Sequence, residues 1–163
     1  GIRHLVALRG DPPAGASRYE PHPGGYAYAT DLVAGLRQVA PFDLSVAAYP
    51  EVHPEAPSSG FDLDNLKRKL AAGASRAITQ FFYDTDNFLR FRDRCVAVGI
   101  TAPIVPGILP IARFRQMTNF AARCGASVPR WLAERFDGLD DPDTERMLGA
   151  SVAIEQVAKL RQN

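Results

Sequence analysis

The chain has 163 residues, of which 46% are hydrophobic and 23% charged, a composition typical of one globular domain with a buried core. A formal net charge of +1 gives no basis for binding nucleic acid or an anionic membrane, and no apolar run approaches the roughly 18 residues that span a bilayer. Cys95 and Cys124 lie in helical patterns without metal-ligand spacing, so we expect buried free thiols in a cytoplasmic protein rather than a disulfide framework.

Short apolar runs and helical patterns alternate along the whole chain. The apolar runs do not alternate cleanly with polar residues, which is typical of strands covered on both faces, and each is followed by apolar residues at helical spacing. In chain order we predict a strand at 4–8, a helix at 30–39, a strand at 44–48, a helix at about 62–70, a strand at 77–82, a helix at about 85–98, a strand at 104–109, and helices at about 112–124 and 142–160.

Capping residues mark the ends of several of these helices. Thr30 or Asp31 is the expected N-cap of the first helix, because a side-chain oxygen there can accept a hydrogen bond from the first turn. Gly73, Gly99 and Gly125 follow the next three helices as C-terminal stops.

This alternation predicts an α/β fold with a parallel sheet, either doubly wound or a (β/α)8 barrel. Four βα units make only half a barrel, and the pattern alone leaves both architectures open. We predict one domain over residues 1–163. Because the chain starts at Gly1 without an initiator Met, we expect it to be truncated.

Uncommon polar residues follow the predicted strands, at the edge where both architectures bind ligands. Arg9-Gly10-Asp11 follows the first strand, and Tyr49-Pro50-Glu51-Val52-His53-Pro54-Glu55-Ala56 follows the second. Gln80 interrupts the third strand, where an unpaired amide would cost several kcal/mol, so we expect it to have a partner or face a cavity. The helix after the fourth strand carries Gln116 and Phe120.

Each of these residues also has a purely structural explanation. Asp11 before Pro is a common turn opener, and His53 could be a hydrogen-bonded loop residue, since no second His stands at metal-ligand spacing. Arg68 and Lys69 are neighbouring cations that could reach a phosphate, although most helices with such residues simply have a solvated polar face. The sequence has no Walker motif and no dinucleotide-binding glycine motif.

Seven runs in this order resemble the methylenetetrahydrofolate reductase family. The run Tyr49–Ala56 is the most specific of them, while Arg9-Gly10-Asp11 is specific only in this company. The matching runs are Ala7–Asp11, Ser45–Ala56, Asn65–Lys69, Ala77–Phe82, Phe91–Cys95, Val105–Pro110 and Gly138–Asp141.

The resemblance implies the fourth to seventh βα units of a partial (β/α)8 barrel, in a homo-oligomeric flavoprotein. It implies ping-pong transfer of a hydride from NADH or NADPH through FAD to 5,10-methylenetetrahydrofolate, with Asp11 and Gln80 as catalytic residues. The folate or the nicotinamide would contact Asp11, Gln80, Gln116 and Phe120. FAD would contact Arg9, Gly10, Asp11, Tyr28, Ala29, Tyr49, His53, Ala56, Asp62, Asn65, Arg68 and Lys69.

The chain departs from the family pattern in what it lacks. The family's general acid is a Glu on the first barrel strand, which we expect to precede Gly1, and neither Glu51 nor Glu55 matches its motif. One alternative is therefore a non-catalytic partial barrel that binds a flavin or a partner. Another flavin-dependent barrel oxidoreductase is disfavoured by the Tyr49–Ala56 run.

Overall fold

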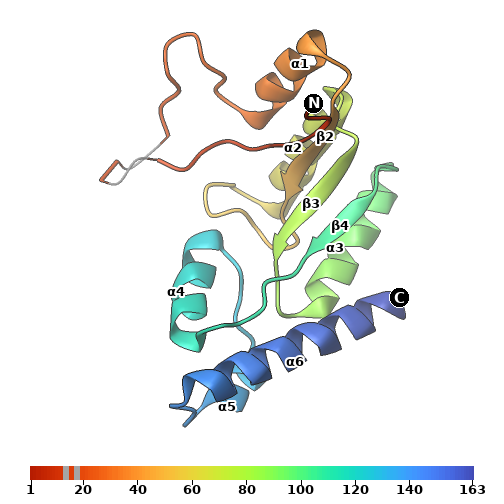
Figure 1. Ribbon diagram of the computed structural model, residues 1–163. Helices are drawn as coiled ribbons and strands as arrows, with labels where there is room; N and C mark the ends of the chain where they lie inside the picture. The colour runs from red at the N-terminus through yellow and green to blue at the C-terminus, as the bar shows by residue number, and fades with distance from the viewer. Residues whose placement is uncertain (13–14, 17–18) are drawn as a thin grey trace.

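The computed structural model describes residues 1–12, 15–16 and 19–163, so part of the predicted Pro/Gly-rich loop after Asp11 lies outside the described residues. Parallel strands alternate with helices, as predicted (Figure 1). In chain order the elements are β1 (His4–Ala7), α1 (Ala29–Val39), β2 (Asp43–Ala48), α2 (Ser59–Ala71), β3 (Arg76–Phe81), α3 (Thr85–Ala97), β4 (Ile104–Gly107), α4 (Phe114–Cys124), α5 (Arg130–Phe136) and α6 (Pro142–Arg161).

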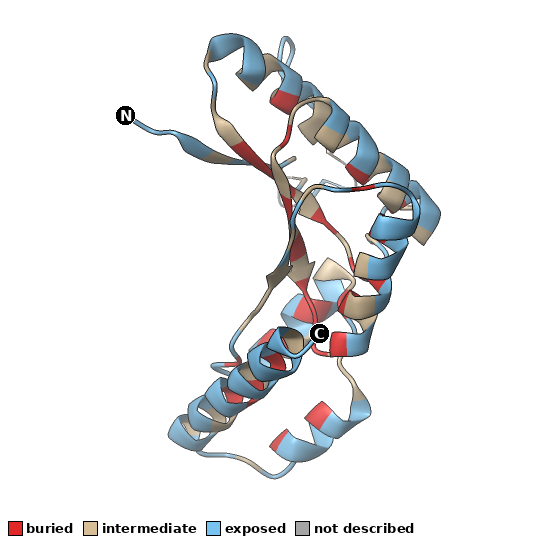
Figure 2. Ribbon diagram, turned by 90° about the vertical axis from the view of Figure 1, so that its right-hand side faces the viewer, coloured by how far each residue is buried: buried red, intermediate tan, exposed pale blue. Residues whose placement is uncertain are grey.

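The strands form one four-stranded parallel sheet in the order β1-β2-β3-β4. Helices α1, α2 and α3 all lie on one side of this sheet (Figure 2). A doubly wound sheet reverses its strand order at a switch point and carries helices on both faces, whereas a (β/α)8 barrel keeps the sequential order with its helices outside. The arrangement is therefore that of a partial barrel.

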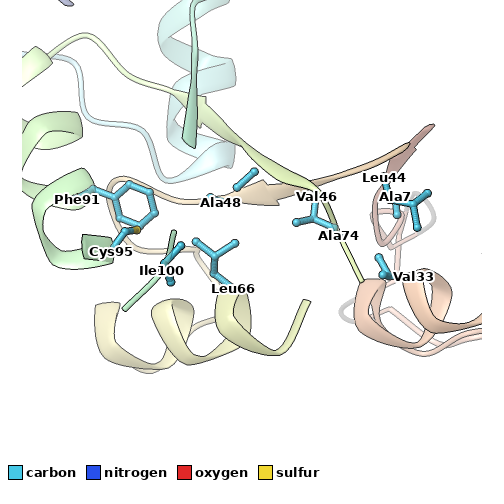
Figure 3. Packing of buried hydrophobic residues seen from close by; sticks show 11 residues of the cluster. Ala7, Val33, Leu44, Val46, Ala48, Leu66, Ala74, Phe91, Cys95 and Ile100 are labelled. Atoms are coloured by element: carbon cyan, nitrogen blue, oxygen red, sulfur yellow. The ribbon is translucent and has the colours of Figure 1, made fainter. Parts of the chain in front are cut away.

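The main core fills the space between the sheet and these three helices (Figure 3). Leu44 and Val46 of β2 point to the helical side and are fully buried, against Val33 of α1, Leu66 of α2 and Phe91 of α3. Burial of each of these side chains contributes about 1.5–3 kcal/mol to folding, which fixes α1–α3 on this face.

The opposite face of the sheet is open in the described part of the chain. Val6 and Leu8 are each 55% exposed and Val105 is 39% exposed. The prediction that both faces of the strands are covered is therefore wrong for these residues. The physical reason is the sequential winding, which places α1–α3 together on the other side.

A second core lies beyond the carboxyl ends of the strands and holds α4, α5 and α6 together (Figure 1). It joins Phe81 at the end of β3 to Met117 of α4, Leu132 and Phe136 of α5, and Val152 of α6. Helix α5 was not predicted from the sequence.

Polar contacts fix the amino-terminal edge of the sheet, at the end away from α4–α6. The carboxylate of Asp43 on β2 accepts hydrogen bonds from His4 of β1 at 2.8 Å and from Arg76 of β3 at 2.6 Å. The hydroxyl of Ser75, followed by these two partners, lowers the pKa of Asp43 to about 2. This cluster joins three adjacent strands in register.

The observed helix ends differ slightly from the predicted ones. The N-cap of α1 is Tyr28, not Thr30 or Asp31, because the helix already begins at Ala29 and the Asp31 carboxylate accepts the Tyr28 backbone N–H at 3.0 Å. Gly125 is the C-cap of α4 with φ of 70°, as predicted, whereas Gly73 and Gly99 each come one residue after the cap.

Strand β4 is shorter than the predicted 104–109, because its pairing with β3 has a register shift and ends at Gly107. Both cysteines are free, with Cys95 buried and Cys124 partly buried. Within residues 1–12, 15–16 and 19–163, no group of acidic, His or Cys side chains is placed to hold a metal ion. No helix in this part of the chain is long and apolar enough to cross a bilayer.

Candidate functional site

A groove of about 290 Å3 opens at the carboxyl ends of β1 and β2. Its remaining walls come from the start of α1, the loop of residues 49–58 (the β2–α2 loop) and α2. The lining residues are Ala7, Leu8, Arg9, Asp11, Tyr28, Ala29, Thr30, Ala47, Tyr49, His53, Glu55, Ala56, Phe61, Asp62, Asn65 and Lys69.

Strand pairing and helix periodicity explain why these residues meet. Because β1 and β2 are parallel neighbours, the chain segments that follow both strands leave at the same edge of the sheet. Helix α2 starts there, with Ser58 as N-cap accepting the Phe61 N–H at 3.2 Å. Asp62, Asn65 and Lys69 then recur at helical spacing on the face that lines the groove.

The β2–α2 loop is held against α2 by hydrogen bonds of its own backbone. The backbone N–H of His53 donates to the buried carboxylate of Asp62 at 2.8 Å. The Nδ1 atom of His53 accepts the Glu55 N–H at 3.0 Å, and the His53 ring packs edge-on against Tyr49 at 4.6 Å between centroids. His53 is thus a hydrogen-bonded loop residue that also lines the groove.

Burial shifts the pKa values of two residues that line the groove. The ammonium of Lys69 donates to the Ala47 carbonyl at 2.5 Å, and burial lowers the pKa of Lys69 to about 8, although the nearby Asp62 carboxylate opposes this shift. Burial also raises the pKa of Tyr49, and the negative charges of Asp62 and Asp11 add to that effect. The Tyr49 phenol is therefore neutral at physiological pH. Both Tyr49 and Lys69 are partly desolvated polar groups at the groove.

Arg9 forms the wall of the groove at the end of β1. Its guanidinium donates to the Glu55 carboxylate at 2.7 Å and lies over the Tyr19 ring at 5.4 Å from the centroid. An arginine held between a carboxylate and an aromatic ring has a fixed orientation. Arg9 is therefore prepositioned at the groove.

Every residue that the resemblance assigns to FAD lines this groove except Gly10 and Arg68. Gly10 is exposed at the rim, beside Arg9 and Asp11. Arg68 is also exposed, and its guanidinium donates to Asn65 at 2.7 Å and lies over the Phe61 ring at 5.8 Å. Arg68 is thus attached to two lining residues without lining the groove itself.

The residues expected to contact substrate are placed less uniformly. Asp11 lines the groove, whereas Gln80 borders an adjoining cavity of about 10 Å3 that shares Tyr49 with it. The Gln80 carbonyl oxygen accepts the Phe81 N–H at 3.0 Å, so the amide has both a partner and a cavity.

Helix α4 brings one substrate candidate to the end of β3 and leaves the other at the surface. Phe120 is 41% exposed and stacks on Phe81 at 5.4 Å between ring centroids. Gln116 is exposed and lines neither the groove nor the small cavity. Phe120 therefore contacts Phe81, the residue that follows Gln80 on β3, whereas Gln116 is not joined to the site.

Sequence reasoning missed several lining residues. Glu55 was set aside because it does not match the motif of a general acid, yet it lines the groove and pairs with Arg9. Phe61 was missed as well, although its position one residue before Asp62 on a helix entering the site was a usable signal. Ala7 and Ala47 have no chemically distinctive side chain, and they line the groove only because of their positions on β1 and β2.

The family model and the related sequences that match this chain all belong to one family. The family model described as methylenetetrahydrofolate reductase matches residues 1–163. A 5,10-methylenetetrahydrofolate reductase of Escherichia coli (strain K12) is 56% identical over 161 residues, which cover 98% of this chain and 52% of that protein. Methylenetetrahydrofolate reductase 2 of Saccharomyces cerevisiae is 38% identical over 165 residues, covering 98% of this chain and 28% of that protein.

The chain thus spans about half the length of the bacterial relatives it matches. Among solved structures, a Clostridium thermocellum protein described as binding two copies of 5-methyl-5,6,7,8-tetrahydrofolic acid matches with a TM-score of 0.61. The match covers 99% of this chain and 60% of that one at 16% sequence identity, so it supports the fold.

Proposed function

This chain belongs to the methylenetetrahydrofolate reductase family, and on that premise we propose that the full-length protein reduces 5,10-methylenetetrahydrofolate to 5-methyltetrahydrofolate with NADH or NADPH and bound FAD. The observation that carries the proposal is the groove at the ends of β1 and β2. It unites ten of the twelve residues that the family resemblance assigns to a flavin dinucleotide, from four separate segments of the chain.

The chemistry of the groove fits such a cofactor. Ala7, Ala47 and Ala56 leave room beside the strand ends for a flat ring, and the aromatic side chains of Tyr28 and Tyr49 offer surfaces for it. Lys69 and Arg9 supply positive charge to the groove, which favours an anionic dinucleotide. If this face of α2 were simply solvated, the Lys69 ammonium would point to water. Instead, Lys69 is part-buried and donates to a backbone carbonyl.

Two polar groups on α2 extend the same fit. Asn65 lines the groove beside Lys69, and its amide can donate to a hydroxyl or a phosphate oxygen. Arg68, attached to Asn65, adds a second cation at the rim. We assign Lys69 and Arg68 to the phosphates, and Asn65 and Asp62 to the hydroxyl and amide groups of the dinucleotide.

FAD bound here would take a hydride from the nicotinamide and deliver it to the folate. Asp11 places a carboxylate in the groove at the end of β1, where it would accept hydrogen bonds from the pterin. The Gln80 amide nitrogen remains a donor while its oxygen accepts the Phe81 N–H, so this side chain can serve the pterin or the nicotinamide amide in turn.

The proton donor of the reaction is the component that we assign to the rest of the protein. Glu51 and Glu55 are the carboxylates of the β2–α2 loop, and both are engaged, with the Ser127 N–H and with Arg9 respectively. The chain spans 52% of the Escherichia coli relative, which leaves ample length for a further barrel strand that carries an acid.

The full-length protein should purify with bound flavin, visible as a flavin absorbance spectrum. Lys69→Met should weaken FAD affinity by about tenfold or more, because a charged hydrogen bond to phosphate is lost. The matched control is Lys67→Met on the same helix, since Lys67 is exposed and lies outside the groove. Equal FAD affinity of the two variants, or no flavin in the wild type supplied with FAD, would contradict the proposal.

A further inference from the structure

The β2–α2 loop contains a second carboxylate, Glu51, that points away from the groove. Both of its oxygens accept the backbone N–H of Ser127, at 3.0 and 3.2 Å. Ser127 lies 76 residues later, in the connection between α4 and α5. Glu51 does not line the groove, so the proposed cofactor contacts do not explain it.

A second contact joins the same two segments. Gly125, the C-cap of α4, has φ of 70°, a left-handed conformation that favours glycine. A Cβ atom at Gly125 would lie 2.9 Å from the carbonyl oxygen of Val52 and 3.1 Å from Cδ of Pro54. The loop and the end of α4 are therefore in close backbone contact, and α4 ends beside the loop (Figure 1).

Helix α4 is also held by apolar packing against the second core and β3. Met117 and Ala121 belong to the second core, and Phe120 stacks on Phe81 at the end of β3. That apolar packing fixes the helix to the sheet. The contacts of Glu51 and Gly125 fix the end of α4 to the β2–α2 loop.

The loop is held independently on its groove side. The His53 N–H donates to Asp62 at 2.8 Å, and Arg94 of α3 donates to the Pro50 carbonyl at 3.2 Å. Loss of the Glu51 carboxylate would therefore leave Tyr49 and His53 in place at the groove. It would release the α4 side of the contact instead.

We propose that Glu51 is a positioning residue that joins the substrate half of the site to the cofactor half. By holding the Ser127 N–H, it fixes the end of α4, and with it Phe120, against the loop that carries Tyr49 and His53. The role rests on the proposed function and on the family resemblance, which assigns Phe120 and Gln80 to the site of the folate and the nicotinamide. This role would explain Glu51, the first Glu of the Tyr49–Ala56 run, which makes none of the proposed cofactor contacts.

The experiment compares Glu51→Ala and Glu51→Gln with the wild type in the full-length protein. Glu51→Ala should raise KM for 5,10-methylenetetrahydrofolate by up to about tenfold, the limit reached if the full cost of one lost charge-assisted hydrogen bond is transmitted to substrate binding, with a smaller change in kcat. FAD affinity should stay within about twofold, since the groove side of the loop keeps its own contacts. Glu51→Gln should fall between the two, because its amide oxygen can still accept the Ser127 N–H.

Hydrogen exchange at residues 125–129 provides a readout that does not depend on catalysis. Glu51→Ala should speed exchange of the Ser127 amide, because the N–H loses its acceptor. Glu134→Gln is the matched control: it removes the same charge on α5, where the carboxylate pairs only with Arg130 in the described structure, at 2.6 Å. It should leave both KM and exchange unchanged.

Several outcomes would overturn the proposal. An unchanged KM in Glu51→Ala, or an equal loss of FAD affinity and substrate affinity, would show that Glu51 does not act on the substrate half. If Glu51→Ala fails to fold, Glu51→Gln, which keeps the size of the side chain and one acceptor oxygen, tests the same contact and should raise KM to a smaller extent. A wild-type protein with neither bound flavin nor turnover would refute the proposed function itself, and the substrate role of Glu51 with it.

Discussion

The proposed phosphate contact of Lys69 couples cofactor binding to the protonation of its side chain. It donates to the Ala47 carbonyl, and its burial lowers its pKa to about 8 from an ordinary value of 10.5. A bound phosphate would favour the charged form of Lys69 and raise its pKa again. Cofactor binding at pH above 8 should therefore take up a proton.

The consequence is a pH dependence of FAD affinity in the full-length protein. Below pH 8 Lys69 is already charged, and the dissociation constant should be flat; above pH 8 it should rise by up to about tenfold per pH unit. Flavin fluorescence titrations between pH 7 and 10 measure this. Lys69→Arg, which stays charged throughout, should remove the slope. A slope retained in Lys69→Arg would assign the proton to another group.

Residue-scale prediction succeeded where local geometry determines the outcome. The chain segments after β1 and β2 converge because parallel strands end at one edge, so Arg9, Asp11 and Tyr49 were correctly grouped from the sequence. Glu51 was not explained, because its partner Ser127 lies in a connection whose position depends on tertiary packing. A local pattern contains no information about a contact 76 residues away.

At the scale of the elements, the sequence reveals periodic helices and misses short ones. Helix α5 has seven residues, of which only Leu132 and Phe136 are buried. One apolar pair at i, i+4 is too short a pattern to predict a helix from the sequence. Helix α5 forms because both side chains enter the second core beside α4 and α6. Helix α6 was predicted because it is long and opens with Pro142 after the N-cap Asp141.

Helix α6 also packs closely against the connection between β4 and α4, at Gly149. A Cβ atom at Gly149 would lie 1.9 Å from the carbonyl oxygen of Ile111, a backbone atom that cannot rotate away. Gly149→Ala should therefore destabilise the full-length protein by about 1–3 kcal/mol, although alanine is the better helix former.

Thermal or chemical denaturation with Gly60→Ala as control measures this effect. Gly60 is also helical, but a Cβ atom there would approach only the Ser58 hydroxyl, at 3.8 Å. Its substitution should change stability by less than about 1 kcal/mol. A neutral or stabilising Gly149→Ala would mean that α6 shifts away from Ile111 without loss of packing.

At the scale of the whole molecule, strand order decided between two architectures that the sequence pattern left equally open. Alternating βα units fit both architectures. Periodicity indicates which residues are buried, but it does not indicate on which face of the sheet each helix packs. The sequential sheet with α1–α3 on one side identified the partial barrel. It also explains the exposed Val6 and Val105, which in a closed barrel would point inward against opposing strands.

This open face and the two edge strands predict how the 163-residue chain behaves when produced alone. Val6, Leu8 and Val105 present apolar surface on one side of the sheet. Strands β1 and β4 each have one neighbour among the described strands, which leaves their outer backbone groups unpaired. Apolar surface next to unpaired strand edges favours association with other chains.

The isolated chain should therefore form dimers or larger species in sedimentation velocity, bind FAD weakly and show no turnover of methylenetetrahydrofolate. Val6→Lys should reduce association, because it places a charge on the open face without entering the helical core. Val96→Lys, on the outer surface of α3 at 67% exposure, makes the same change away from that face and should leave association unaltered. A monodisperse monomer with stoichiometric FAD and measurable turnover would show that the groove needs neither a closed barrel nor the remaining strands to do its chemistry.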